Sequence, residues 1–372
     1  MSSPEPQVRA TRNPATPSRS RGPVVAVTGA ATGVGDLLAR RLAASGEIKR
    51  VVAIDERRGG AEDATWHVLD VRDPAIAERL RGEDVDVVVH LALDLDLESD
   101  PAARTAYNVR GTQTVLTAAA AAGVHRVVLC TSAMVYGALP DNDIPLSEDA
   151  ELRATAEATA VGDLLEIERL GRRAPRAHPG LNVTVVRPAM LVGGTDTALT
   201  RYFESPRLLV VAGSRPTWQF CHVEDLVGAL EYAALGRVEG EFAVGCDGWL
   251  EQEQVEELSG IRRMELPSAV ALGAAARLHR IGLTPSPAGD LAYTMYPWVV
   301  SVGALHDAGW RPGWTNERVL AALLDEVQGR HTVAGRRLGR KDATAAGAAG
   351  ATVALLGTAA VVRRVRKARR RL

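Results

Sequence analysis

The chain has 372 residues, with 44 lysine plus arginine residues against 45 aspartate plus glutamate residues. No lysine lies between residues 50 and 340, which excludes from that span any enzyme with a lysine nucleophile and any Walker-type phosphate loop. Residues 363–372 carry seven basic residues and no acidic one, so the rest of the chain is acidic and we expect no nucleic-acid partner.

Residues 1–22 are rich in proline, serine and arginine and contain no apolar stretch. This composition predicts a disordered leader rather than a secretory signal. The three cysteines, Cys130, Cys221 and Cys246, are widely separated in the sequence. Their spacing fits neither a disulfide framework nor a metal site, so we expect no metal, buried free thiols and a cytoplasmic protein.

From residue 23 onward, short β-branched runs alternate with helical patterns. Strands are predicted at 24–27, 51–54, 66–69, 85–91, 127–130 and 183–186, and helices at 36–45 and 112–122. Continuous apolar runs are typical of parallel strands that are covered on both faces. Residues 23–194 are therefore predicted to form an α/β fold, a Rossmann-type doubly wound parallel sheet.

Past residue 194 the alternation weakens. Helices are predicted at 223–235, 251–258, 267–279 and 315–328. We expect residues 195–330 to form a smaller C-terminal cap region, which completes the fold over a ligand crevice at the carboxyl ends of the strands.

Residues 331–372 combine an alanine-rich apolar segment with the basic tail. The uncharged stretch 343–362 has 20 residues, enough to span a bilayer, but alanine and glycine make it weakly apolar. Basic residues on both sides favour contact of residues 343–372 with an anionic membrane surface over a span. A helix contact through small residues and a flexible extension stay open as alternatives.

The glycine-rich segment 28–35 directly follows the first predicted strand and opens a helix. Gly29 would allow the tight turn, Gly33 the approach of a pyrophosphate, and Gly35 the close packing of helix and strand. Asp55 follows 20 residues after Gly35, at the end of the second strand. This arrangement predicts a dinucleotide site with the phosphates at a helix N-terminus.

Asp55 also predicts which dinucleotide binds. Its carboxylate would accept hydrogen bonds from the adenosine ribose hydroxyls and repel a 2′-phosphate, so NAD is favoured over NADP. Arg57 and Arg58 follow closely and weaken that preference.

Further motifs follow in order, and together they resemble an extended short-chain dehydrogenase/reductase of the NAD-dependent epimerase/dehydratase family. They lie at 28–35, Asp55, 70–71, 88–92, 108–112, 131–137, 187–188, 222–226 and 308–312, within residues 24–328. One departure is the glycine spacing, since Thr32 occupies the usual middle position and Gly33 follows; both spacings hold a dinucleotide.

The resemblance implies which residues contact the cofactor. They are Gly29, Ala31, Thr32, Gly33, Val34, Gly35, Asp55, Asp70, Val71, Leu91, Ala92, Asn108, Thr131, Arg187 and Pro188. The resemblance also suggests a homodimer.

In this family a serine or threonine, a tyrosine and a lysine act together in general acid–base chemistry. Ser132 matches the serine. With Glu166 as the anchor of the YxxxK motif, the tyrosine position falls on Ala158 and the lysine position on Gly162. Shifting the register supplies neither side chain, because no tyrosine lies between Tyr136 and Tyr202. The motif is therefore predicted to be degenerate.

Other residues could act as bases in principle. His67, His90 and His222 are candidates, although His90 lies in a buried strand motif where a structural role is the more common one. Tyr136 belongs to the serine motif, and we expect it to be a packed loop aromatic.

The substrate side departs from the nucleotide-sugar members as well. Two positions where the family binds the substrate pyrophosphate with arginine are Trp218 and the segment 286–290 here, and neither is basic. Arg201, Arg207 and Arg215 could compensate, although we expect surface roles for them. Five aromatic residues could line an apolar pocket or simply pack in the core: Trp218, Trp249, Tyr293, Tyr296 and Trp298.

Three functions therefore remain open. The first is an NAD-binding protein that also binds an unknown small molecule and acts as a binding or regulatory protein, or as an atypical enzyme. The second is an active oxidoreductase or epimerase with a substitute acid–base group, acting on a sugar or on an apolar, lipid-linked alcohol. The third is a scaffold that binds neither.

Overall fold

The computed structural model describes residues 22–157, 159–194, 196–267 and 292–328, and the backbone of two short strands, β14 (Thr332–Val333) and β15 (Arg336–Arg337). Several predictions concern residues outside these ranges. They are the leader, Ala158, most of the predicted helix at 267–279, the segment 286–290 and the apolar stretch 343–362.

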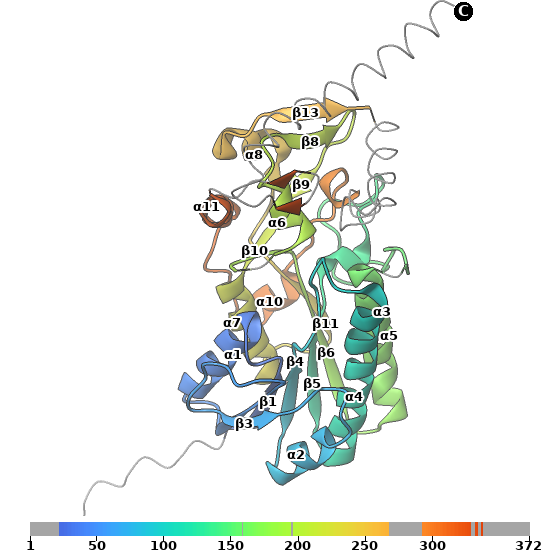
Figure 1. Cartoon of the computed structure of the whole chain (residues 1–372), viewed down its shortest axis with the longest axis vertical. Coiled ribbons are helices and arrows are strands. Elements are labelled where there is room, and N and C mark those ends of the chain that lie inside the picture. The colour runs from blue at the N-terminus through green and yellow to red at the C-terminus, as the bar shows by residue number, and fades with distance from the viewer. Residues whose placement is uncertain are drawn as a thin grey trace, which may run out of the picture.

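A sheet of seven parallel strands forms the centre of the molecule (Figure 1), which confirms the predicted fold class. Its order is β11-β6-β5-β4-β1-β2-β3. The strands are β1 (Val24–Thr28), β2 (Arg50–Asp55), β3 (Thr65–Val68), β4 (Val87–His90), β5 (Arg126–Cys130), β6 (Asn182–Pro188) and β11 (Glu241–Val244).

Helices cover both faces of this sheet. On one face pack α1 (Gly33–Ala44) and α7 (Val223–Ala234), and on the other pack α2 (Ile76–Gly82), α4 (Gly111–Ala122) and α5 (Ala160–Ala177). The middle strands are apolar on both faces because each face meets a helical layer. Gly123 ends α4 with a φ of +81°, the left-handed conformation that glycine adopts readily.

The strand order creates a switch point beside β1. From β1 the chain adds β2 and β3 on one side, and it then returns to add β4, β5 and β6 on the other side. The connections after β1 and β4 therefore diverge and leave a crevice at the carboxyl ends of these strands, where ligands of such sheets bind.

Between the sheet strands lie short helices that shape this crevice. The chain after β4 forms α3 (Pro101–Thr105) and continues directly into η1, a π-helical turn at Ala106–Arg110, and then into α4. The 3₁₀ turn η2 (Ala133–Tyr136) follows β5.

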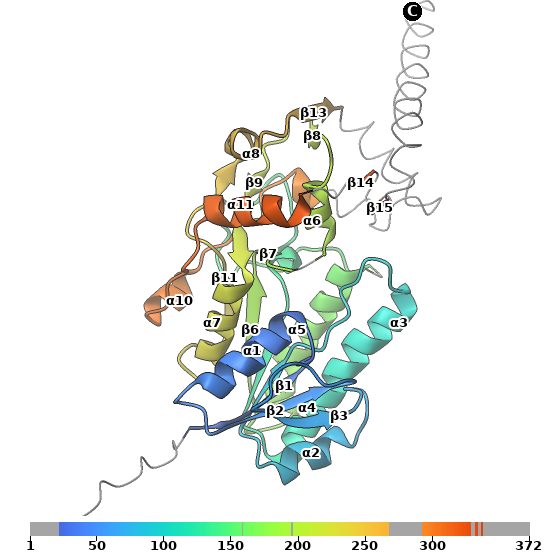
Figure 2. The same cartoon turned by 60° about the vertical axis from the view of Figure 1, so that its left-hand side comes forward.

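The remaining elements form the smaller region above the carboxyl ends of the strands (Figures 1 and 2). They are β7 (Met190–Val192), α6 (Ala198–Tyr202), β8 (Leu208–Val211), β9 (Thr217–Trp218), β10 (Phe220–His222), β12 (Leu250–Glu251), α8 (Gln252–Ser259), β13 (Arg263–Leu266) and α11 (Asn316–Val327). Helix α10 (Gly303–Asp307) instead packs against β11, beside the sheet. Within the described residues, no helix is long and apolar enough to cross a membrane.

Three elements inside the range predicted for the cap, β11, α7 and α10, belong to the sheet layers instead. Strand β11 pairs with β6, and α7 packs over the sheet beside α1. The sequence does not indicate this pairing, because residues 241–244 pair with a strand that lies more than fifty residues earlier in the chain.

Candidate functional site

The turn between β1 and α1 is built around two glycines. Gly29 has a φ of +71° and donates from its N–H to the carbonyl of Ile54 at 2.9 Å. A Cβ on Gly29 would lie 2.7 Å from the backbone N of Ala92, and a Cβ on Gly35 would lie 1.9 Å from the carbonyl O of Gly29. Side chains at these positions would force the turn, the helix and the β4 loop apart.

The outer side of this turn is open. Gly33 has a φ of +55°, is exposed, and a Cβ built on it meets nothing within 4 Å. Thr32 precedes α1, and its side chain forms no capping hydrogen bond. The first N–H groups of α1, together with half-buried Ala31 and Val34, therefore face a space that suits a phosphate.

Asp55 lies at the end of β2, as predicted, next to this turn. One carboxylate oxygen accepts a hydrogen bond from the N–H of Ala31 at 2.9 Å. This contact fixes the carboxylate between the turn and the crevice. The second carboxylate oxygen can accept a hydrogen bond from a ligand hydroxyl. Arg57 and Arg58 follow at exposed positions.

Two residues that the sequence reasoning missed, Arg72 and Tyr107, complete this side of the crevice. Asp70 accepts hydrogen bonds from Arg72, and this contact above all lowers the pKa of Asp70. The Arg72 guanidinium lies 5.3 Å from the centre of the Tyr107 ring. Burial, together with nearby carboxylates that include Asp55, raises the pKa of Tyr107 to about 12. Val71 is buried and packs against Gly111 at the start of α4.

The loop after β4 begins with half-buried Leu91 and buried Ala92, which close the crevice beneath the glycine turn. Just before them, His90 lies buried between the hydroxyls of Thr28, at 2.7 Å, and Thr112, at 3.0 Å. The Thr112 hydroxyl donates to the carbonyl of Asn108, so it can only accept from His90. Burial lowers the pKa of His90 to about 4, which makes it a neutral structural residue.

Asn108 is fully buried and holds the same loop from below. Its side-chain oxygen accepts from the N–H of Asp94 at 2.7 Å, and its NH₂ group donates to the carbonyl of Asp94 at 2.9 Å. The NH₂ group also contacts the carboxylate of Asp163 at 3.2 Å. The side chain thus shapes the crevice through Asp94 and does not face it directly.

Thr131 and Ser132 follow β5 at the carboxyl edge of the sheet. Buried Thr131 donates its hydroxyl to Glu168 at 2.7 Å. Ser132 is half-buried, and its Oγ accepts from the N–H of Met134 at 3.2 Å, which caps η2. The Ser132 hydroxyl hydrogen stays available to a ligand.

Arg187, at the end of β6, has a structural position. The side chain is completely buried, and it forms a bidentate pair with Glu168 at 2.7 and 2.9 Å. It also donates to Glu241 and to the hydroxyl of Tyr136. Its predicted contact with a cofactor therefore conflicts with its burial, and Pro188 beside it is buried in the same strand.

The N-terminus of α5 begins at a capping threonine. The side-chain oxygen of Thr159 accepts from the N–H of Gly162 at 3.0 Å, and a Cβ on Gly162 would lie 1.8 Å from the carbonyl O of Glu157. Glu166, the anchor used for the motif, pairs on the surface with Arg169. Glu168 is the buried glutamate of this helix.

If Glu168 were the anchor instead, the tyrosine and lysine positions would move to Ala160 and Leu164. Neither alignment places an ionisable group at these positions.

The residues considered as alternative bases lie in different parts of the molecule. His67 lies on β3 and contacts Glu83 at 3.0 Å. His222 caps α7 and stacks on Trp314 with the ring centres 3.7 Å apart. Tyr136 is fully buried, as expected, and donates its hydroxyl to the carbonyl of Glu148 at 2.8 Å.

Most of the aromatic candidates pack in the interior. Trp218 is buried and stacks on Tyr202 at 5.3 Å between ring centres. Tyr293 and Trp298 are buried against each other, and the hydroxyl of Tyr293 donates to the carbonyl of Met134 at 2.7 Å. Tyr296 and Trp249 are half-buried.

Arg201 differs from its expected surface role. It is buried and pairs with Asp196 at 2.8 Å and with Glu98 at 3.3 Å. Arg207 and Arg215 are exposed, as expected.

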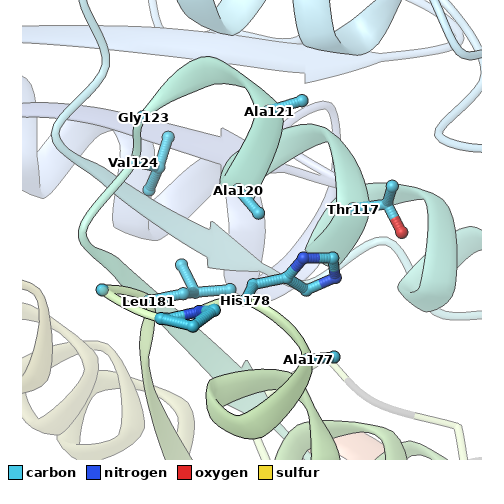
Figure 3. Close-up of a pocket in the computed structure, with 10 residues that line it drawn as sticks. Thr117, Ala120, Ala121, Gly123, Val124, Ala177, His178 and Leu181 are labelled. Atoms are coloured by element: carbon cyan, nitrogen blue, oxygen red, sulfur yellow. The ribbon is translucent and has the colours of Figure 1, made fainter.

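A separate cavity of about 490 Å³ lies at the opposite, amino edge of the sheet (Figure 3). It is lined by Ala120 in the last turn of α4, by Val124 just after that helix, and by His178 and Leu181 after α5. It is therefore distant from the glycine turn. The described residues contain no cluster of three potential metal ligands.

Comparison with known proteins agrees with this architecture. The model of the NAD dependent epimerase/dehydratase family matches residues 25–245. An uncharacterized protein of Mycobacterium tuberculosis is 32% identical over 323 residues, which cover 82% of this chain and 84% of that protein.

Two solved structures share the fold. UDP-glucose 4-epimerase of Thermotoga maritima, determined with UDP-glucose, has a TM-score of 0.61 at 17% identity and covers 81% of this chain and 97% of its own. UDP-glucose 4-epimerase of Thermus thermophilus, in complex with NAD, has a TM-score of 0.60 at 20% identity, with 82% and 99% covered. Since the family model spans most of the chain, this protein belongs to the NAD-dependent epimerase/dehydratase family.

Proposed function

We propose that the protein binds NAD in the crevice beside β1 and acts as a cofactor-dependent binding or regulatory protein, or as an atypical enzyme. The observation that carries this proposal is the contrast between two neighbouring parts of the site. The turn with its open helix N-terminus and the Asp55 carboxylate suit a dinucleotide. The start of α5 offers no phenol and no ammonium group, and Gly162 leaves no room for a side chain.

The chemistry of the family explains why this contrast matters. A bound nicotinamide ring supplies or accepts hydride, but a substrate hydroxyl must lose or gain a proton in the same reaction. The phenol of Tyr136 is already bonded to Glu148 and Arg187, and burial raises its pKa. Proton transfer would then depend on Ser132, whose hydroxyl is a weak acid and a weak base.

A second candidate is an active oxidoreductase or epimerase with a substitute group. It is favoured by Ser132, which stays half-buried at the carboxyl edge of the sheet with a hydroxyl hydrogen to donate. The ligand beside it would be a small molecule without a pyrophosphate, because Trp218 packs in the aromatic core at a position where nucleotide-sugar members carry arginine.

Calorimetric titration of the full chain with NAD and NADP tests the proposal. We expect NAD to bind at least about tenfold more tightly, because the Asp55 carboxylate repels a 2′-phosphate at close range. Asp55→Asn should weaken NAD binding and reduce the difference between the two dinucleotides. Asp149→Asn, the same change at an exposed loop position, is the control and should bind NAD and NADP with the affinities of the wild type.

Absence of saturable binding of either dinucleotide would contradict the proposal. Turnover separates the two candidates: steady NADH formation from an alcohol, or epimerisation of a sugar without net NADH formation, would favour the active enzyme if it is lost in Ser132→Ala. The proposals of a cytoplasmic location, a homodimer and membrane contact through residues 343–372 are independent of this result.

A further inference from the structure

A buried charged cluster lies where α3, η1 and α5 meet. Its centre is Asp163, which is 3% exposed, and its cation is Arg104, which is 8% exposed. One oxygen of Asp163 accepts from Nε of Arg104 at 2.9 Å and from the NH₂ group of Asn108 at 3.2 Å. The other accepts from the hydroxyl of Thr105 at 2.7 Å. We call these four residues the Asp163 cluster.

The sheet order places this cluster beside one half of a bound dinucleotide. Asp55 on β2 marks the adenosine side, and the phosphates belong at the start of α1. The nicotinamide half must then extend to the other side of the switch point, over the carboxyl ends of β4 and β5. The cluster lies on that side, because α3 and η1 follow β4, and α5 contacts the residues after β5 (Figure 1).

Asn108 connects the cluster to the crevice. Its side chain bonds both the N–H and the carbonyl of Asp94, in the loop that starts with Leu91 and Ala92. Asp163 fixes the Asn108 amide by accepting from it, so the loop is held through one continuous chain of hydrogen bonds. The cluster therefore controls the position of the wall that a nicotinamide riboside would touch.

The chemistry of the cluster indicates more than simple packing. A carboxylate only accepts, and this one receives hydrogen bonds from three different donor groups, which no neutral side chain of the same shape can do. Burying an ion pair carries a large desolvation penalty, and an apolar pair would fill the space without it. One member of the cluster, Asn108, lies in the π-helical turn η1, an irregularity found frequently at functional sites.

We propose that Asp163 is a positioning residue for the nicotinamide half of the bound dinucleotide, acting through Asn108 on the loop after β4. Asp163 directly follows Gly162, so a fixed buried ion pair lies beside the position predicted for the family lysine. The inference rests on the proposed function, because it requires that NAD bind in this crevice.

The test compares two ligands by calorimetry, NAD and ADP, since ADP contains the adenosine and pyrophosphate but no nicotinamide riboside. In Asp163→Asn, an NH₂ group replaces one of the two accepting oxygens, so the side chain can no longer accept from all three donors and no longer carries the charge that pairs with Arg104. The hold of this residue on Asn108 and on the loop after β4 is thereby weakened. We expect about a tenfold weaker affinity for NAD and less than a twofold change for ADP. Glu166→Gln, on the same helix but bonded only at the surface, should change neither.

A second variant controls for loss of the fold, because Asp163→Asn removes the carboxylate that pairs with the buried Arg104. Replacing both charges, in Arg104→Met with Asp163→Leu, removes the cluster without leaving a lone ion. This double variant should also keep ADP affinity and lose NAD affinity. The inference is overturned if the folded double variant binds NAD within twofold of the wild-type affinity, or if its affinities for NAD and ADP fall equally.

The proposed function fails in a different way. A wild-type chain that binds ADP but not NAD would contradict both the proposed function and the role of Asp163. A wild-type chain that binds NAD, with both variants unchanged, contradicts the role of Asp163 alone.

Discussion

His90 shows how a buried ionisable residue at the edge of the site connects stability to pH. Its ring accepts from Thr28 and donates to Thr112, an arrangement that suits the neutral form, and burial lowers the pKa from 6.5 to about 4. The unfolded chain takes up a proton at this residue as the pH falls below about 6.5, whereas the folded chain does so only near pH 4. The stabilisation by His90 is therefore complete above pH 6.5 and is lost on acidification.

We predict that the free energy of unfolding of the wild type falls by about 3 kcal/mol from this residue between pH 6.5 and 4. His90→Gln removes the ionisable group, so its profile should be flatter over the same interval, even though the variant is less stable at pH 7. Guanidinium chloride unfolding at a series of pH values measures both profiles. The exposed His125→Gln serves as control, and parallel profiles for wild type and His90→Gln would show that His90 is not the cause.

Among the elements, α5 has a sterically crowded first turn. Thr159 caps the helix, and the backbone of Glu157 fills the space next to Gly162, so that a Cβ there would lie 1.8 Å from a carbonyl oxygen. We predict that Gly162→Ala destabilises the protein by about 1–3 kcal/mol, because the helix start must move. A lysine at this position would meet the same obstacle and would not restore an active site.

Another helical glycine, Gly82, lies in open space and serves as the control. Gly82 is the last residue of α2, and a Cβ on it meets nothing within 4 Å. Gly82→Ala should therefore be neutral or stabilising by about 0.5 kcal/mol, through the lower entropy of the unfolded chain. Thermal unfolding of both variants is the measurement, and equal melting temperatures would refute the crowding at Gly162.

The elements that were predicted correctly are those whose sequence pattern lies within the element itself. The runs in β1, β2 and β5 are apolar at every central position, because both faces of these strands are buried. The dinucleotide turn was equally predictable, since Gly29, Gly35 and Asp55 act within one strand–turn–helix–strand unit.

Long-range contacts could not be predicted in the same way. Nothing near β11 indicates that it pairs with β6, and nothing in the motif around Glu166 shows that Glu168 is the buried residue. Arg187 matched a cofactor motif by its neighbours in the sequence, but its partners come from α5 and β11. The Asp163 cluster likewise joins residues more than fifty positions apart.

At the scale of the whole molecule, one buried network joins the sheet to the segments around it. Arg187 on β6 pairs with Glu168 on α5 and with Glu241 on β11. It also donates to the carbonyl of Glu148, whose carboxylate accepts from the N–H groups of Ala243 and Ala304. The side chain of Arg187 therefore joins β6 to α5, to β11 and to the loop at Glu148.

We predict that Arg187→Met lowers the free energy of unfolding by about 3–5 kcal/mol, because it leaves Glu168 charged, buried and without its cation. Adding Glu168→Leu should recover much of the loss, since an apolar pair needs no desolvation of ions. The exposed pair of Arg153 and Asp141 is the control, and Arg153→Ala should cost less than about 1 kcal/mol. Guanidinium chloride unfolding of the single and double variants gives the coupling energy. If Arg187→Met costs no more than Arg153→Ala, the network does not hold the molecule together.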